Sequence, residues 1–129
     1  MTNLQTGAYQ NIQTITADPG HLVLMLYDGA TVYLRRALRA LERGDNAGFA
    51  HALSGATGII GELSTSLDHE VGGEVAANLV RLYGFMLRHL SEALVGRRRD
   101  NVEQVLGILE TLRDAFDGAI TTAPAPSAT

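Results

Sequence analysis

The spacing of apolar residues constrains the fold of this chain more than any other feature. Three long stretches carry apolar side chains in alternating steps of three and four, which places them on one face of a helix. The positions are Phe49, Leu53, Ala56, Ile60, Leu63 and Leu67 in the first stretch, Val75, Leu79, Leu82, Met86, His89 or Leu90, and Ala93 in the second, and Val102, Val105, Leu109, Leu112, Phe116 and Ala119 in the third. No stretch alternates over six residues beside a hairpin turn, so the pattern does not predict strands.

Residues typical of helix ends divide the chain into four helices. They are Asp18 with Pro19 at the first start, Gly44 at the first end, Asp45 or Asn46 at the second start, Gly72 and Gly73 in a connection over 69–73, Gly96 at the third end, and Asp100 with Glu103 as a capping box at the fourth start. We therefore expect helices over about 19–43, 46–67, 74–95 and 101–118.

Short connections between helices of this length favour antiparallel neighbours. The sequence thus predicts an all-α fold, an antiparallel up-down four-helix bundle, and the length of 129 residues favours a single domain. The expected organisation is an N-terminal strap over residues 1–17, the bundle domain over 18–118, and a disordered tail over 119–129.

Composition excludes several kinds of chemistry. The chain has no cysteine, so it forms no disulfide and has no thiol nucleophile or cysteine metal site. All ten basic residues are arginines, so a Schiff-base or phosphate-loop lysine is also excluded. The net charge of −4 argues against broad attraction to nucleic acid or to an anionic membrane.

We expect no metal site, no cofactor and no catalytic centre. None of the four histidines has a glutamate three residues before it, as a di-iron bundle would need, and no nucleophile elbow is present. The longest apolar run, Leu22–Tyr27, has six residues, which is too short to span a membrane. Without a basic N-terminal region typical of a signal peptide, the chain is predicted to be cytosolic.

Two of the expected helices carry more apolar surface than a bundle core needs. The run Leu22–Tyr27 is apolar around its whole circumference, and a second stripe follows beside the first on the third helix. We expect Leu22, Met25, Leu26 and Gly29 to face the bundle, Val23, Leu24 and Tyr27 to face outward or sideways, and Val80, Tyr83, Leu87 and Leu94 to form the second stripe. A helix that is apolar on two faces must bury both or bind something.

Two interpretations of this surplus surface remain open, and both can hold together. The N-terminal strap, with Leu4, Tyr9, Ile12 and Ile15, can fold back and cover the surface. Alternatively, a segment of a partner binds there, and the strap then competes with it for part of the surface.

The glycines inside the helices and the Arg97–Arg99 run also have two interpretations each. The glycines are Gly29, Gly48, Gly55, Gly58, Gly61, Gly84 and Gly107. They indicate either close helix–helix approach or a shallow groove in which another chain lies. The arginines form either a solvated loop that suits the C-terminal dipole of the third helix or a contact for phosphate or an acidic partner.

Five segments in order resemble one known family. They are Ala8-Tyr9-Gln10 with Ile15-Thr16, the run from Asp18 to Gly29, Gly44-Asp45, the pieces Ile59–Leu63, Ser66–Asp68 and Gly72–Glu74, and Asn78–Met86. The second segment is similar to the pattern Pro-x-x-Leu-x-x-Met-Leu-Tyr-Asp-Gly of the flagellar secretion chaperones, commonly called FliS. The resemblance covers about residues 8–118, and it departs from the family at His21, Gly58, Gly61 and Gly84.

The resemblance implies a helical bundle that is not an enzyme. It implies that the chain binds newly made flagellin at its disordered C-terminal segment, prevents premature polymerisation, and presents flagellin to the flagellar type III export gate. The partner-binding residues that we expect are Tyr9, Gln10, Ile12, Ile15, Leu22, Val23, Leu24, Tyr27, Val80, Tyr83 and Leu87. The alternative is a generic helical-bundle adaptor that forms homodimers through its surplus apolar stripe.

Overall fold

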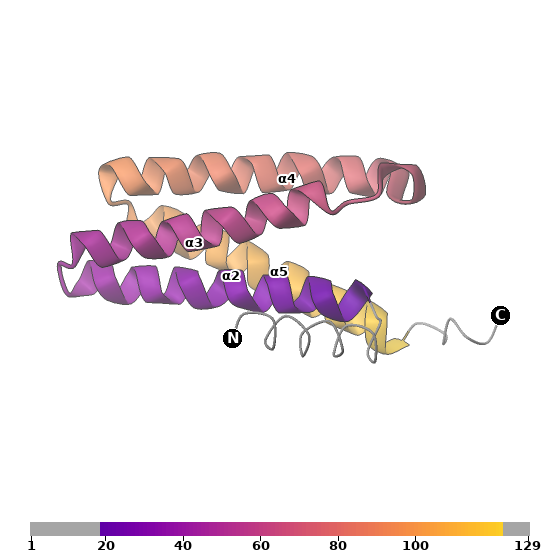
Figure 1. Cartoon of the computed structure of the whole chain (residues 1–129), viewed down its shortest axis with the longest axis horizontal. Helices are drawn as coiled ribbons and strands as arrows, with labels where there is room; N and C mark the ends of the chain where they lie inside the picture. The colour runs from indigo at the N-terminus through magenta and orange to yellow at the C-terminus, as the bar shows by residue number, and fades with distance from the viewer. Residues whose placement is uncertain (1–18, 123–129) are drawn as a thin grey trace, which may run out of the picture.

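The computed structural model describes residues 19–122, which form four α-helices and no strand. The helices are α2 (Pro19–Glu42), α3 (Asn46–Thr65), α4 (His69–Gly96) and α5 (Arg99–Thr122). Helix α2 packs between α3 and α5, and α4 packs against the other sides of the same two helices (Figure 1). Helices α2 and α4 therefore lie diagonally across an up-down bundle, as the sequence predicted.

The turn between α2 and α3 forms as expected from its sequence. Gly44 has a positive φ of 71°, a conformation that glycine adopts without strain. Asp45 is the N-cap of α3, and its carboxylate accepts a hydrogen bond of 2.9 Å from the backbone N–H of Gly48. This short turn places α3 directly beside α2.

One predicted boundary is confirmed and two are wrong. Gly73 has a φ of 53° and a ψ of −122° and breaks the helix at the point where the connection over 69–73 was predicted to end, although the residues before it form a short helical turn. Helix α5 begins at Arg99, so Asp100 lies inside its first turn and Glu103 pairs with Arg99 at 3.0 Å instead of completing a capping box. Helix α5 also continues to residue 122, four residues into the predicted tail. The strap over 1–17 lies outside the described residues.

The core is built from the predicted apolar stripes together with small residues on α2. The stripe of α3 is buried at Phe49, Leu53, Ala56, Ile60 and Leu63. Facing it, the α2 residues Ala30, Ala37 and Ala40 are at most 2% exposed. Small side chains at these positions allow the two helices to approach closely.

Glycine contributes to this close approach at two positions. A Cβ at Gly29 would lie 3.1 Å from Cδ1 of Ile59, and a Cβ at Gly55 would lie 2.5 Å from the ring of Tyr33. The close-approach interpretation is therefore confirmed for Gly29 and Gly55. At Gly58 and Gly107, by contrast, a Cβ would meet nothing within 4 Å among the described residues beyond the local helix backbone.

The predicted faces of α2 and α4 are wrong at five residues. Leu24, Tyr27 and Tyr83 were expected on the surplus surface, yet they are 8%, 3% and 1% exposed. Met25 and Val75 were expected to face the core, yet they are 58% and 65% exposed. Burial of the tyrosines is possible because their hydroxyl groups hydrogen-bond to each other across the bundle diagonal, with an O–O distance of 2.5 Å. Burial raises the pKa of both tyrosines, so both remain protonated at neutral pH.

Candidate partner-binding site

An apolar groove runs between α4 and α5. Its volume is about 710 Å³. We call it the α4/α5 groove, and it is lined by Leu82, Phe85, Gln104, Gly107, Ile108, Thr111 and Leu112. Phe85 is 40% exposed, although it is one of the largest apolar side chains of the bundle. Gly107 adds no side chain to the groove, so a bound segment can approach the α5 backbone closely.

At one end of the α4/α5 groove, ring stacking and hydrogen bonds hold the side chain of Phe85. The ring of His89 stacks on the ring of Phe85 with a centroid distance of 4.8 Å. Nε2 of the same histidine lies 2.5 Å from Oε1 of Gln104 on α5. Buried Asn101 donates a hydrogen bond of 3.0 Å to the backbone carbonyl of His89. These contacts fix the position of Phe85 before any partner binds.

A second, smaller groove follows the opposite side of α4, where it faces α3. This α3/α4 groove has a volume of about 250 Å³ and is lined by Ala50, Leu53, Ser54, Thr57, Leu87, Leu90, Ser91 and Leu94. Leu94 is 45% exposed and Leu87 is half-buried. Helix α4 is therefore flanked by apolar surface on both sides.

The predicted partner-binding residues fall into three groups. Leu22, Val23, Val80 and Leu87 are half-buried, and of these Leu87 lines the α3/α4 groove. Leu24, Tyr27 and Tyr83 belong to the core. Tyr9, Gln10, Ile12 and Ile15 lie outside the described residues.

Sequence reasoning missed the α4/α5 groove. It assigned Leu82 and Leu112 to core stripes, and it gave no role to Phe85 or Ile108. Phe85 and Ile108 are large and apolar, and neither belongs to the apolar stripe predicted for its own helix. This was the feature of the sequence that pointed to a groove. A groove arises only when two such positions from different helices meet, and a single-helix pattern does not report that pairing.

The arginines of the Arg97–Arg99 segment mainly contact other residues of the bundle. Arg99 reaches Glu42 of α2 at 3.1 Å, which joins the end of α2 to the start of α5. Arg98 hydrogen-bonds to Asp100, and this contact lowers the pKa of that carboxyl group. Arg97 takes a positive φ of 50° where the chain leaves α4. Asp28 of α2 pairs with Arg113 of α5 at 2.9 Å in a similar inter-helix contact.

The structure offers no metal-binding cluster within residues 19–122: no group of three or more His, Asp or Glu side chains lies together there. In the same part of the chain, no helix is both long and apolar enough to cross a membrane. Every buried side-chain nitrogen and oxygen in this range has a hydrogen-bond partner. The two grooves beside α4 offer exposed apolar surface, which suits binding of a protein segment.

The fold and the grooves together define the class of protein as a helical bundle with exposed apolar grooves. Comparison with known proteins is more specific. The family model described as flagellar protein FliS matches residues 1–123, and the chain belongs to this family.

Several relatives that are named as flagellar secretion chaperones align with this chain over most of their length. The flagellar secretion chaperone FliS of Salmonella typhimurium is 41% identical over 103 residues, which cover 79% of this chain and 76% of that protein. FliS of Bacillus subtilis is 34% identical, covering 88% and 84%, and FliSB of Pseudomonas aeruginosa is 35% identical, covering 82% and 84%. These relatives are chaperones, so the chain is a flagellar export chaperone and not an enzyme.

Proposed function

We propose that this chaperone binds the disordered C-terminal segment of flagellin in the cytosol, with the two grooves beside α4 as the binding site. Binding covers an apolar segment that would otherwise drive polymerisation, and it keeps flagellin available to the flagellar type III export gate. The proposal rests on the α4/α5 groove. This groove is apolar and half-exposed, although the chain as a whole has a net charge of −4.

The shape of the groove favours a helical ligand. An amphipathic helix docks by placing apolar side chains at steps of three and four into a groove of this kind. The exposed ring of Phe85 and the half-buried side chain of Ile108 supply apolar contacts on the two walls. A segment that is disordered when free can fold on binding and continue around α4 to Leu87 and Leu94 in the second groove.

The N-terminal contacts implied by the family resemblance are part of the same proposal. Tyr9, Gln10, Ile12 and Ile15 contact flagellin or cover its site in the free protein. Leu22 and Val23 at the start of α2 stand half-buried and extend the proposed contact surface toward the strap.

A binding titration with two forms of flagellin tests this proposal. Full-length flagellin is expected to form a one-to-one complex, whereas flagellin without its C-terminal segment is expected to bind at least about tenfold more weakly, a loss of about 1.4 kcal/mol. Isothermal titration calorimetry measures both affinities, and sedimentation gives the mass of each species. Equal binding of both forms would overturn the proposal. If the chaperone is instead a dimer, and the dimer dissociates only when residues of the groove are substituted, the result would support the alternative function, a helical-bundle adaptor that forms homodimers.

A further inference from the structure

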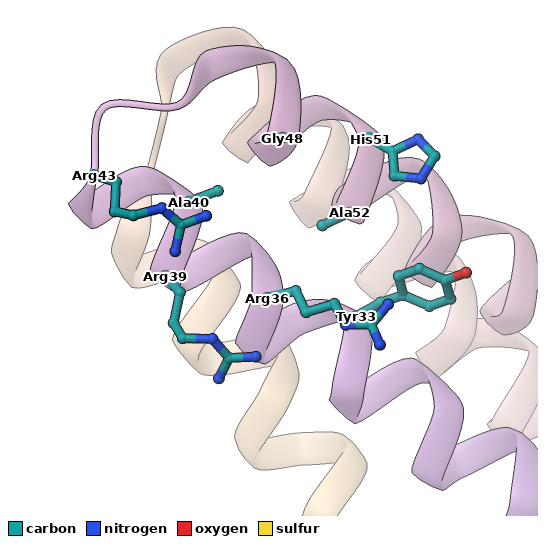
Figure 2. A pocket seen from close by; sticks show the side chains of 8 residues that line it. All are labelled: Tyr33, Arg36, Arg39, Ala40, Arg43, Gly48, His51 and Ala52. Carbon is teal, nitrogen blue, oxygen red and sulfur yellow. The ribbon is translucent and has the colours of Figure 1, made fainter.

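A third groove, on the side of the bundle opposite the α4/α5 groove, is basic. It lies between the end of α2 and the start of α3, has a volume of about 340 Å³, and is shown in Figure 2. We call it the arginine groove, and it is lined by Tyr33, Arg36, Arg39, Ala40, Arg43, Gly48, His51 and Ala52. No acidic residue is among these lining residues, although acidic residues outnumber basic ones in the chain, 14 to 10.

The arginines of this groove stand in a row. Arg36, Arg39 and Arg43 follow one another in steps of three and four, so they share one face of α2, and His51 stands on the neighbouring turn of α3 (Figure 2). The guanidinium group of Arg36 lies over the ring of Tyr33, 5.6 Å from the ring centroid, which restrains its side chain.

Among the described residues, two of these arginines lack the carboxylate partner that Arg35, Arg99 and Arg113 have. Arg35, Arg99 and Arg113 each pair with a carboxylate on another helix, namely Glu110, Glu42 and Asp28. Within residues 19–122, Arg36 and Arg39 have no carboxylate within 4 Å, and Arg43 has only a long contact of 3.8 Å to Asp45. The dipole of α2 accounts for Arg39 in its last turn, but not for Arg36, which lies one step of three residues before that turn.

We propose that the arginine groove docks an acidic segment of a protein partner other than flagellin's C-terminal segment. Arginine binds carboxylates through two parallel hydrogen bonds, so a row of arginines of which two have no carboxylate partner in the described part of the chain favours a row of carboxylates. From Arg36 to Arg43 the row rises about 10 Å along the helix axis, which matches acidic residues at positions i, i+3 and i+7 of a partner helix. The small side chains of buried Ala40 and Ala52 leave room for a close approach.

A protein segment fits this groove better than a nucleic acid does. The arginine row is about two helical turns long, and the chain as a whole has a net charge of −4. A long polyanion would extend beyond the row and be repelled by the net negative charge, whereas a short acidic segment matches the length of the row.

This inference goes beyond the proposed flagellin site because the arginine groove lies on a different face from the α4/α5 groove. The arginine groove is formed by α2 and α3, whereas the α4/α5 groove is formed by α4 and α5. An acidic segment in the arginine groove therefore leaves the α4/α5 groove open for flagellin.

A peptide-binding experiment without flagellin tests the inference. The probe is a fluorescein-labelled, alanine-rich helical peptide with glutamates at i, i+3 and i+7, and its control is the same peptide with glutamines. The test variant is Arg36→Gln with Arg39→Gln. The matched control is Arg81→Gln with Arg88→Gln, which removes the same charge from exposed positions on α4. Circular dichroism checks that both variants keep the helical content of the unmodified chaperone.

The glutamate peptide is expected to bind the unmodified chaperone and the α4 control about equally, and the test variant about tenfold more weakly. Its affinity is expected to fall between about 20 mM and about 200 mM salt, because exposed ion pairs are screened. The glutamine peptide is expected not to bind.

Three outcomes would overturn the inference. They are equal binding by the test and control variants, equal binding of both peptides, and tighter binding of a single-stranded DNA oligonucleotide than of the glutamate peptide. Adding a saturating flagellin C-terminal fragment afterwards is expected to leave peptide affinity unchanged, and displacement of the peptide would refute the separation of the two sites. Since the first titration contains no flagellin, its failure leaves the flagellin proposal standing.

Discussion

Replacing Gly107 with glutamate is expected to weaken flagellin binding by about 100-fold while the bundle stays folded. Gly107 is exposed, and a Cβ there meets nothing within 4 Å among the described residues beyond the local helix backbone, so the larger side chain fits. Glutamate also favours the helical state more than glycine does, by about 0.5 kcal/mol. When flagellin covers the α4/α5 groove, however, the new carboxylate loses water without gaining a partner, which costs about 2.7 kcal/mol or more.

The matched control for this variant is Gly58→Glu. Gly58 is also exposed, lies inside a helix and has open space at the Cβ position, but it lines neither groove beside α4. Calorimetric titration with flagellin should give an affinity for the control within about threefold of the unmodified protein. If both variants bind equally well, flagellin does not use the α4/α5 groove. If Gly107→Glu unfolds, the open space assigned to this position is wrong.

The second large effect concerns the buried tyrosine pair. Changing either Tyr27 or Tyr83 to phenylalanine leaves the other hydroxyl buried without its partner, and this is expected to lower the free energy of unfolding by about 1–3 kcal/mol. Removing both hydroxyl groups removes the unsatisfied group as well. The double variant is therefore expected to be more stable than the sum of the two single losses predicts.

Urea denaturation of the two single variants and the double variant measures this coupling directly. Tyr33→Phe serves as control, because Tyr33 is half-buried and no hydrogen bond of its hydroxyl group is seen within residues 19–122. The control is expected to change the free energy of unfolding by less than about 0.5 kcal/mol. Strictly additive losses would show that the two hydroxyl groups do not depend on each other.

The helical architecture was predictable because apolar periodicity is a local property of each helix. The stripe from Phe49 to Leu63 identified both the helix and its buried face, and Gly44 with Asp45 identified the first turn. The break at Gly73 was also predictable from the glycine pair, whereas the ends of α5 were not, because end signals locate a helix boundary only to within a few residues.

The inward face of α2 was not predictable from α2 alone. The run Leu22–Tyr27 is apolar on every side, so its sequence does not reveal which side faces the core. The structure turns Tyr27 inward because Tyr83, 56 residues later, supplies a partner for its hydroxyl group. The α4/α5 groove has the same origin, because it needs Phe85 and Ile108 to meet across two helices.

The central claim is that flagellin's C-terminal segment lies in the α4/α5 groove, and site-directed crosslinking tests it most directly. The chain has no cysteine, so a single introduced cysteine carries a photo-crosslinker at one known position. Thr111→Cys places it in the groove on an exposed residue, and Ala47→Cys places it on an exposed residue of α3 outside both grooves beside α4. The account predicts that mass spectrometry finds crosslinks from position 111 to the C-terminal segment of flagellin and none from position 47. Crosslinks from position 47 alone, or from position 111 only to other parts of flagellin, would contradict it.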